Sequence, residues 1–486
     1  MEAGSSFGTA AKAMTAAAVV LALTGSAALS VASAQEARHS AGADRHAKGP
    51  AAGVWRMDGY GTVLTVGRGG KRVQEYQTTG VSCLKGASAE RVRGGGGAAR
   101  YETGDGESFT LRGVGGGGHR ASMHVDGSPG DRHLRRVGEL PGRCGIDVPG
   151  NDPVATFDVF WQTFEENYPF FAAKGIDWHA VRDRFRPRID EHTSRKELFA
   201  VFREMVAPLH DAHVAVLAGD TGSFAQVRPG TRMPTAELDA KVREFIEQRD
   251  LEGRGLREFA GGRIGYADLP GGQGYLRVSG FTGYTEDGDH AADRAELGRA
   301  LDAVLTKDRT ARLQGLIVDL RINGGGSDSL GLELAARLTG RPHFAYAKAA
   351  RNDPADPAHF TGPQPVYVRP VPERPRYTGP VAVLTGGSTL SAGETFTQAL
   401  MERPGRTVRI GEHTQGVFSD TLERRLPNGW SFLLPNEEFR TRDGRTFDGT
   451  GIPPHIAEPV FTDEEFEHDR DSAFDRAVAE LGRDRR

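Results

Sequence analysis

The stretch GPVAVLTGGSTLSAGETFTQAL, residues 379–400, decides the fold. An apolar run at 381–384 ends at two glycines, and residues 395–400 continue with helical spacing. We therefore predict a strand, a tight turn and a helix. Ser391 falls at the start of this helix, where unpaired backbone N–H groups and the positive end of the helix dipole converge. A hydroxyl at that point lies beside groups that could hold an oxyanion.

The same serine has a simpler interpretation as a helix cap. Ser391 and Glu394 have the spacing of a capping box, in which both side chains satisfy backbone donors. The stretch is not a nucleophile elbow, because G-x-S-x-G would need glycine where Thr389 stands. Taken alone, the stretch favours the cap, so evidence for chemistry must come from other parts of the chain.

Length and composition limit what the chain can be. At 486 residues with 38% hydrophobic content, it is long enough for about three domains. The net charge is −4 and the basic residues are scattered along the sequence. We therefore expect no nucleic-acid partner.

The N-terminus has the pattern of an export signal. Residues 13–34 are rich in Ala, Val and Leu and end in Ala-Ser-Ala before Gln35. We predict a signal peptide over 1–34, a disordered linker over 35–50, and hence a secreted or extracellular protein. The alternative is an uncleaved anchor, although Thr, Gly and Ser interrupt the run. No later stretch is apolar enough to span a bilayer.

Residues 51–150 alternate between apolar and polar side chains, which predicts a small all-β domain that could close as a barrel. Both cysteines of the chain, Cys83 and Cys144, fall in this region. In an exported protein we expect them to form a disulfide, and the alternative is two buried thiols. The glycine runs at 94–97 and 115–118 predict loops, because no strand and helix flank them as a nucleotide site requires.

Residues 151–216 predict a helical domain. Capping patterns at 152–153 and 194–197 begin two helices, whose aromatic and aliphatic stripes are typical of a core. The second helix ends shortly before His213, which then lies at a helix-to-strand junction. The two histidines and one aspartate at 210–213 are weak evidence for a metal site without a distant fourth ligand.

After a connector at 217–272, strands and helices alternate regularly through 273–460. This order predicts a mainly parallel sheet with ligands at the carboxyl ends of its strands. Three glycines at 324–326 follow a buried strand and could turn backbone N–H groups toward an anion. Neither G-x-G-x-x-G nor G-K-S/T is present, so we predict no nucleotide site. Residues 461–486 predict a C-terminal helix.

Four blocks together resemble a known family. They are LHDAH at 209–213, VDLRINGGG at 318–326, STLSAGE at 388–394 and FDGTGIPPHI at 447–456. In this order they are similar to the C-terminal processing, or tail-specific, serine peptidases and their relatives around the tricorn core protease. With the helices after residue 150, the resemblance covers roughly two thirds of the chain. It implies a multidomain fold with a crotonase-like α/β catalytic domain over 273–460.

The resemblance also implies roles for individual residues. Ser391 matches the nucleophile, and the backbone N–H groups of Gly325 and Ala392 match the oxyanion hole. Family members with a Ser/Lys dyad carry a lysine where this sequence has Val417. The resemblance is therefore to the tricorn-core-like branch, in which a histidine is the base. His213 matches that base, and Asp448 stands where an orienting glutamate is usual.

The sequence thus predicts an exported serine peptidase that hydrolyses peptide bonds through an acyl-enzyme on Ser391. This chemistry needs no metal or cofactor. The expected partner is a peptide or protein substrate, and the chain could also form a homo-oligomer. His413 is a second candidate base, although a structural role in a loop is simpler. The alternative function is a catalytically degenerate binding protein for apolar ligands on the same fold.

Overall fold

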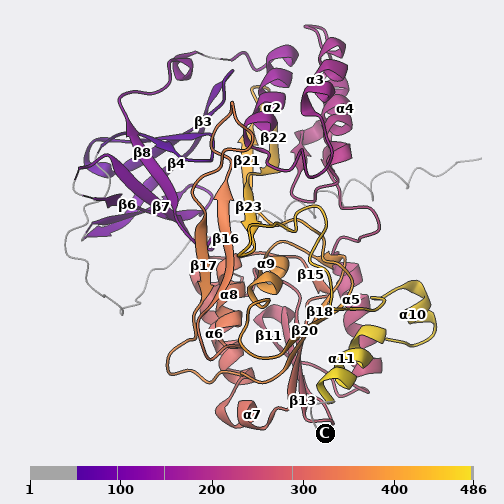
Figure 1. Ribbon diagram of the computed structural model, residues 1–486. Helices are drawn as coiled ribbons and strands as arrows, with labels where there is room; N and C mark the ends of the chain where they lie inside the picture. The colour runs from indigo at the N-terminus through magenta and orange to yellow at the C-terminus, as the bar shows by residue number, and fades with distance from the viewer. Residues whose placement is uncertain (1–51, 96, 116, 147, 287, 483–486) are drawn as a thin grey trace, which may run out of the picture.

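The computed structural model describes residues 52–95, 97–115, 117–146, 148–286 and 288–482. The predicted signal peptide at 1–34 and linker at 35–50 lie outside these residues. In the described part of the chain, no helix has both the length and the apolar character needed to cross a membrane. Three parts are visible in Figure 1: a group of strands in indigo, a layer of helices α2 to α4, and a larger α/β part.

The N-terminal part is a closed antiparallel barrel of eight strands, and its all-β character is as predicted. The strands are β1 (Gly53–Met57), β2 (Thr62–Val66), β3 (Arg72–Thr78), β4 (Cys83–Gly95), β5 (Ala98–Thr103), β6 (Ser108–Val114), β7 (Arg120–Val125) and β8 (Arg132–Val137). Pairing of β1 with β8 closes the barrel. The predicted disulfide joins Cys83 at the start of β4 to Cys144 in the short helix η2 (Gly142–Gly145).

Three helices follow: α2 (Pro153–Asn167), α3 (Trp178–Phe185) and α4 (Arg195–Val206). Asp152 caps α2 by accepting from the N–H of Ala155 at 3.0 Å, and Ser194 and Glu197 form the predicted capping box of α4. The Phe160 ring stacks on that of Phe202, with centroids 4.0 Å apart, which fixes α2 against α4. Their aromatic faces are therefore core, as their spacing predicted.

A second antiparallel sheet joins the helical part to a distant segment. It has the order β10–β9–β22–β21, with strands β9 (Ala215–Leu217), β10 (Ser223–Ala225), β21 (Thr421–Arg425) and β22 (Ser431–Pro435). Trp55 of the barrel, Phe160 of α2 and Phe432 of β22 belong to one continuous hydrophobic core. The barrel and the helical part are thus not packed as independent units, although they are separate in sequence.

The α/β part is built on a seven-stranded sheet with the order β11–β12–β13–β14–β18–β20–β24. Its strands are β11 (Arg257–Phe259), β12 (Ile264–Asp268), β13 (Gln273–Val278), β14 (Gly315–Asp319), β18 (Val381–Thr385), β20 (Thr407–Gly411) and β24 (Ile456–Ala457). Pairing is antiparallel from β11 to β13 and parallel from β13 onward. The predicted mainly parallel sheet is therefore present.

Helices cover both faces of this sheet. In β14, Leu316 and Val318 point into a core with α6 (His290–Val304), α8 (Asp328–Ala336) and α9 (Ala392–Ala399). Ile317, between them, points into a second core with α5 (Ala236–Phe245) and α11 (Ser472–Gly482). This alternation follows from the two-residue period of a strand, and it explains why the central strands are apolar throughout.

Two features differ from the sequence-based expectation. A three-stranded antiparallel sheet, β17–β16–β23, extends from the α/β part toward the barrel (Figure 1), and its strands are β16 (His343–Ala350), β17 (Gln364–Val368) and β23 (Glu437–Arg440). The C-terminal helix predicted over 461–486 is two helices, α10 (Asp463–Glu467) and α11. Asp469 between them has a φ of 51°, which no helix can accommodate.

Candidate active site

Ser391 lies directly before α9, in a backbone conformation that side chains rarely adopt. Its φ is 49° and its ψ is −116°. The preceding residues form the short strand β19 (Ser388–Thr389), which pairs in parallel with β15 (Ile322–Asn323). A non-glycine residue at positive φ costs on the order of 1–3 kcal/mol, and such strain concentrates at functional sites. The conformation of Ser391 therefore favours a functional role over a simple cap.

The carboxylate of Glu394 holds this turn in place. It accepts hydrogen bonds from the backbone N–H groups of Ser391 at 3.2 Å, Gly416 at 2.7 Å and Val417 at 2.9 Å. The N–H of Ser391 also lies 3.2 Å from the carbonyl oxygen of Val417. Burial raises the pKa of Glu394 to about 7, although its hydrogen bonds oppose this shift. The glutamate of the predicted capping box thus ties Ser391 to residues 416–417.

Gly325 lies against Ser391. A Cβ atom on Gly325, whose φ is +81°, would come within 2.7 Å of the Ser391 Cβ and 3.3 Å of the Ala392 nitrogen. The close approach explains why glycine is required here. However, the N–H of Gly325 donates to Oδ1 of Asn323 at 2.9 Å. Within the described residues, the N–H groups of Ala392 and Gly326 have no acceptor.

His213 is buried, with 2% of its surface exposed. Its backbone N–H donates to Oδ1 of Asp211 at 2.9 Å, and Oδ2 of Asp211 accepts from the Tyr168 hydroxyl at 2.7 Å. Burial lowers the pKa of the imidazole, and the charges of Asp211 and Asp420 only partly offset this effect. The ring is therefore neutral near pH 7, which is the protonation state of a general base. Its Nδ1 is buried with no hydrogen-bond partner among the described residues.

Hydrophobic contacts bring the histidine and serine segments together. Ala212, Leu390 and Val417 form one cluster of buried residues. Ala212 directly precedes His213, and Leu390 directly precedes Ser391, so the two segments meet although 178 residues separate them, from 213 to 391. Val227 and Met233 of the connector pack against the same cluster.

Asp448 lies in this neighbourhood but is not hydrogen-bonded to His213. Its carboxyl group accepts from the N–H of Phe418 at 3.1 Å and from the Thr446 hydroxyl at 2.6 Å. Burial raises the pKa of Asp448 well above its usual value, and the charges of Asp211 and Glu394 add to this. The expected contact between Asp448 and the imidazole is therefore not formed in this structure.

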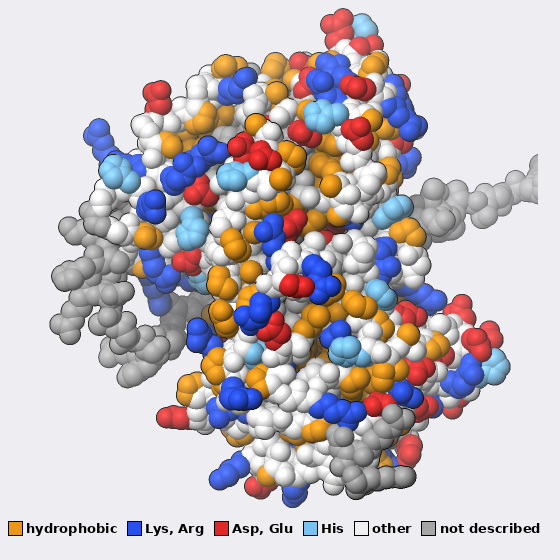
Figure 2. Space-filling model, in the orientation of Figure 1, with side chains coloured by type: hydrophobic (Ala, Val, Ile, Leu, Met, Phe, Trp, Pro, Cys, Tyr) orange, Lys and Arg blue, Asp and Glu red, His pale blue; other side chains and the backbone are white. Residues whose placement is uncertain are grey.

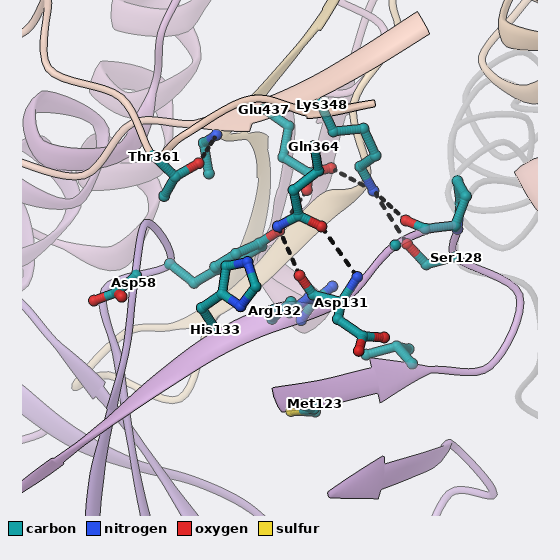
Figure 3. A pocket seen from close by; sticks show the side chains of 15 residues that line it. Asp58, Met123, Ser128, Asp131, Arg132, His133, Lys348, Thr361, Gln364 and Glu437 are labelled. Carbon is teal, nitrogen blue, oxygen red and sulfur yellow. Dashed lines mark hydrogen bonds and ion pairs between the residues drawn. The ribbon is translucent and has the colours of Figure 1, made fainter. Parts of the chain in front are cut away.

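The second candidate base, His413, and the buried Lys348 lie in other environments. His413 is exposed, and its Nδ1 lies 3.2 Å from the carbonyl oxygen of Thr450. Lys348 is buried where the barrel meets the α/β part (Figure 3), with its Nζ 3.1 Å from a carboxylate oxygen of both Asp420 and Glu437. In the described part of the chain, neither side chain is hydrogen-bonded to Ser391.

Sequence reasoning missed the residues that hold the segment 414–417. The backbone N–H of Arg228 donates to Oε1 of Gln415 at 2.9 Å, and its Nη2 donates to the Thr414 carbonyl oxygen at 2.8 Å. Nε2 of Gln415 donates to the Thr231 hydroxyl at 2.8 Å. These partners come from the predicted connector, which has no motif, so no local pattern in the sequence indicates the contacts.

Two family descriptions match the chain. Residues 272–458 match peptidase family S41, and residues 149–207 match the tricorn protease C1 domain. No curated protein matches the sequence.

Solved structures are also similar to the chain. A structure titled "putative peptidase", from Parabacteroides merdae, is 25% identical, covers 68% of this chain and 96% of its own, and has a TM-score of 0.57. The photosystem II D1 C-terminal processing protease is 18% identical, with coverages of 63% and 93% and a TM-score of 0.40. The tricorn protease is 14% identical, with coverages of 87% and 45% and a TM-score of 0.42.

Proposed function

Because the chain carries a serine peptidase domain of family S41 beside a tricorn C1 domain, we propose that it hydrolyses peptide bonds through an acyl-enzyme on Ser391. The α/β part is then the catalytic domain, of the crotonase-like type. The observation that carries this proposal is the conformation of Ser391, at positive φ and in contact with Gly325. A serine that only capped a helix would not require this strained backbone.

In this proposal His213 is the general base and acid. A serine hydroxyl is a weak nucleophile until a base removes its proton, and no lysine occurs after Lys348. The lowered pKa of His213 keeps the imidazole unprotonated and able to accept that proton. After the acyl-enzyme forms, the imidazolium returns the proton to the leaving amine. The orphaned Nδ1 then needs an acceptor, because the imidazolium carries a proton on both ring nitrogens.

We propose Asp448 as the acid that stabilises the imidazolium. Because burial raises its pKa, its carboxyl group would have to ionise and turn from Thr446 toward His213 when the positive charge forms. Asp211 is the second candidate, because its charge raises the pKa of His213. The variants Asp448→Asn and Asp211→Asn test the assignment. Replacing the acid that stabilises the imidazolium should lower kcat by about a hundredfold or more.

The oxyanion of the tetrahedral intermediate needs backbone donors. The N–H of Ala392 is free among the described residues and lies at the positive end of α9. Gly325 is the proposed second donor, and an oxyanion would share its N–H with Asn323. The neighbouring N–H of Gly326 has no acceptor in the described chain and is the alternative second donor. Removing one such donor typically costs about a hundredfold to a thousandfold in kcat.

A fluorophosphonate probe tests the proposed nucleophile directly. We expect the probe to label the purified protein and to fail with Ser391→Ala, with loss of peptide hydrolysis in the same variant. Ser388→Ala is a matched control, since this hydroxyl, three residues away, donates to the Arg232 carbonyl oxygen at 2.7 Å. Equal labelling of wild type and Ser391→Ala would contradict the proposal and favour the alternative of a ligand-binding protein.

Export is a further part of the proposal. It is supported by the signal-like pattern at 1–34 and by the disulfide between Cys83 and Cys144, because disulfides persist in oxidising compartments. Fractionation of producing cells, with N-terminal sequencing of the mature protein, tests it. A mature chain that begins after Ala34 is the expected result.

A further inference from the structure

A cavity of about 390 Å³ opens where the barrel, the end of α2 and the segment after β16 meet. Five segments contribute to its lining, with residues that include Arg56 and Met57, Thr78, Thr79, Gly80 and Ser82, Pro141 to Arg143, Glu166 and Asn167, and Arg351 and Asn352. The disulfide fixes two of these walls to each other, because Cys83 follows the second segment and Cys144 follows the third. A volume of this size suits a small ligand.

Arg351 is the unusual group in this cavity. Only 3% of its surface is exposed, yet no carboxylate among the described residues lies within ion-pair distance. Its Nη1 donates to the Tyr168 carbonyl oxygen at 3.2 Å, while Nε is buried without a partner in the described chain. Burial lowers the pKa of this guanidinium. The charges of Glu165, Glu166 and Asp356 only partly offset this effect, and none of these carboxylates pairs with the guanidinium directly. A buried guanidinium without a direct ion pair is costly, and an anion in the cavity would relieve that cost.

The rest of the lining adds positive charge. Arg56 and Arg143 are exposed at the mouth, and neither forms an ion pair with another described residue. Glu166 is the one acidic residue of the lining. Its Oε1 already accepts from the N–H of Gly80 at 2.6 Å and from Gln162 at 2.7 Å, and burial raises its pKa. The lining thus has three guanidinium groups and one acid whose charge burial disfavours.

We propose that this cavity binds the carboxylate or phosphate group of a small anionic ligand, with Arg351 as the principal contact and Arg56 and Arg143 at the mouth. A planar guanidinium matches both anions with paired N–H donors. Thr79 and Ser82, whose hydroxyls lie 2.8 Å from each other, and the backbone of the nearby glycines are further polar groups of the lining. This binding does not depend on the proposed peptidase activity, so the two can fail separately.

Thermal unfolding of the full chain tests the site. Sodium phosphate and sodium acetate are the probes, each compared with sodium chloride at the same ionic strength. We expect at least one of the two anions to raise the Tm of the wild type in a saturable way. Arg351→Gln should weaken the apparent affinity by about tenfold or more, because a charge-assisted contact is lost. Arg112→Gln, an exposed barrel arginine outside the cavity, should bind as the wild type does.

A second variant keeps the test decisive if Arg351→Gln does not fold. The double exchange Arg56→Gln and Arg143→Gln changes only exposed residues and should also weaken binding. Two pairs of ligands then distinguish a carboxylate ligand from a phosphate ligand. A short peptide with a free C-terminus is compared with the same peptide amidated, and glycerol phosphate is compared with glycerol. The proposal would be overturned if no anion raised the Tm in a saturable way, or if the Tm rose equally in the wild type and the cavity variants.

Discussion

Glu394 supports the turn at Ser391 by accepting from three backbone N–H groups, which an ionised carboxylate does more strongly than a protonated one. Its pKa lies at about 7 because it is buried. Protonation replaces one acceptor with a donor and should loosen the segment 416–417. We therefore predict that the rate of peptide hydrolysis rises with pH through about 7, as this carboxyl group ionises.

A pH–rate profile of Glu394→Gln checks this prediction. The variant should be less active, and the change in rate near pH 7 should disappear, since no group at position 394 ionises. Glu197→Gln, in the capping box of α4, alters the same motif at an exposed place and should keep the wild-type profile. A profile that is the same in Glu394→Gln and wild type would assign the pH dependence to another group.

The same carboxyl group predicts the opposite pH trend for stability. Its folded-state pKa, about 7, lies above its ordinary value of 4.5. The folded state therefore binds the proton more tightly, and this stability is complete below the ordinary pKa and lost as pH rises through about 7. The difference amounts to about 3 kcal/mol at most. Unfolding of wild type and Glu394→Gln across this range measures it, and the variant should show the smaller loss.

Single substitutions distinguish the two candidate bases, His213 and His413. We predict that His213→Ala lowers kcat by about a thousandfold or more, because the base that activates Ser391 is lost. His413→Ala should have little effect, since this side chain is exposed and its Nδ1 lies 3.2 Å from the Thr450 carbonyl oxygen. Steady-state kinetics with one peptide substrate decides between them. Near-normal kcat in His213→Ala would mean that the base is misassigned.

At the scale of elements, β16 and β23 fasten the barrel to the α/β part. Lys348 of β16 contacts Glu437 of β23 and Ser128 of the barrel, which Figure 3 also draws, and Asp420, each at 3.1 Å. Burial lowers the pKa of Lys348, but the two carboxylates outweigh this effect and the net shift is upward. The lysine therefore stays charged and acts as a shared counter-ion.

Lys348→Met should destabilise the protein because it leaves the buried Glu437 and the partly buried Asp420 without their shared cation. Loss of one partner from a buried ion pair costs about 3 kcal/mol or more. Denaturant unfolding of the variant measures this loss. Arg442→Gln removes an exposed ion pair with Glu402 and should leave the unfolding midpoint unchanged. A Lys348→Met protein as stable as the wild type would show that the cluster contributes little.

The elements differ in how far the sequence predicts them. The strands and helices of 273–460 follow clear periodicities, and β18 and α9 form close to the apolar run at 381–384 and the helical spacing at 395–400. The strand β16 was not predicted, because its Lys348 is a buried charge whose partners lie 72 and 89 residues further on, at 420 and 437. A local pattern cannot show that such a charge will be paired. The break at Asp469 was also not predicted, because the capping box of α10 indicates where a helix begins and not where it ends.

At the scale of the whole molecule, the candidate site draws on three separate parts of the chain. The family resemblance predicts that Ser391, His213 and Gly325 belong to one site, whereas the spacing of these residues in the sequence does not. The resemblance also could not predict that Asp448 bonds to Thr446, or that Gly325 donates to Asn323. Which of several nearby acceptors or donors forms a hydrogen bond depends on differences in distance of a few tenths of an ångström. On the face shown in Figure 2, acidic and basic side chains are interspersed, in agreement with the scattered charges of the sequence.

Tyr168 connects the cavity at Arg351 to the segment that bears the candidate base. Its backbone carbonyl oxygen accepts from Arg351, while its hydroxyl donates to Asp211, which also accepts from the backbone N–H of His213. Tyr168→Phe removes the hydroxyl but keeps the carbonyl oxygen that Arg351 contacts. We predict that kcat falls by about tenfold, since a hydrogen bond to a charged acceptor is lost beside the base. Anion binding at Arg351 should remain.

A matched variant separates this positioning effect from a general loss of stability. Tyr275 is also buried and donates to Oδ2 of Asp319 at 2.7 Å, the same distance as from Tyr168 to Asp211, but it lies in β13. Tyr275→Phe should lower the Tm by a similar amount and leave kcat and its pH profile nearly unchanged. If kcat falls in both variants only in proportion to the loss in Tm, Tyr168 has a structural role and does not position the base. A selective fall of kcat in Tyr168→Phe, at unchanged KM, would show that the helical layer orients the segment bearing His213.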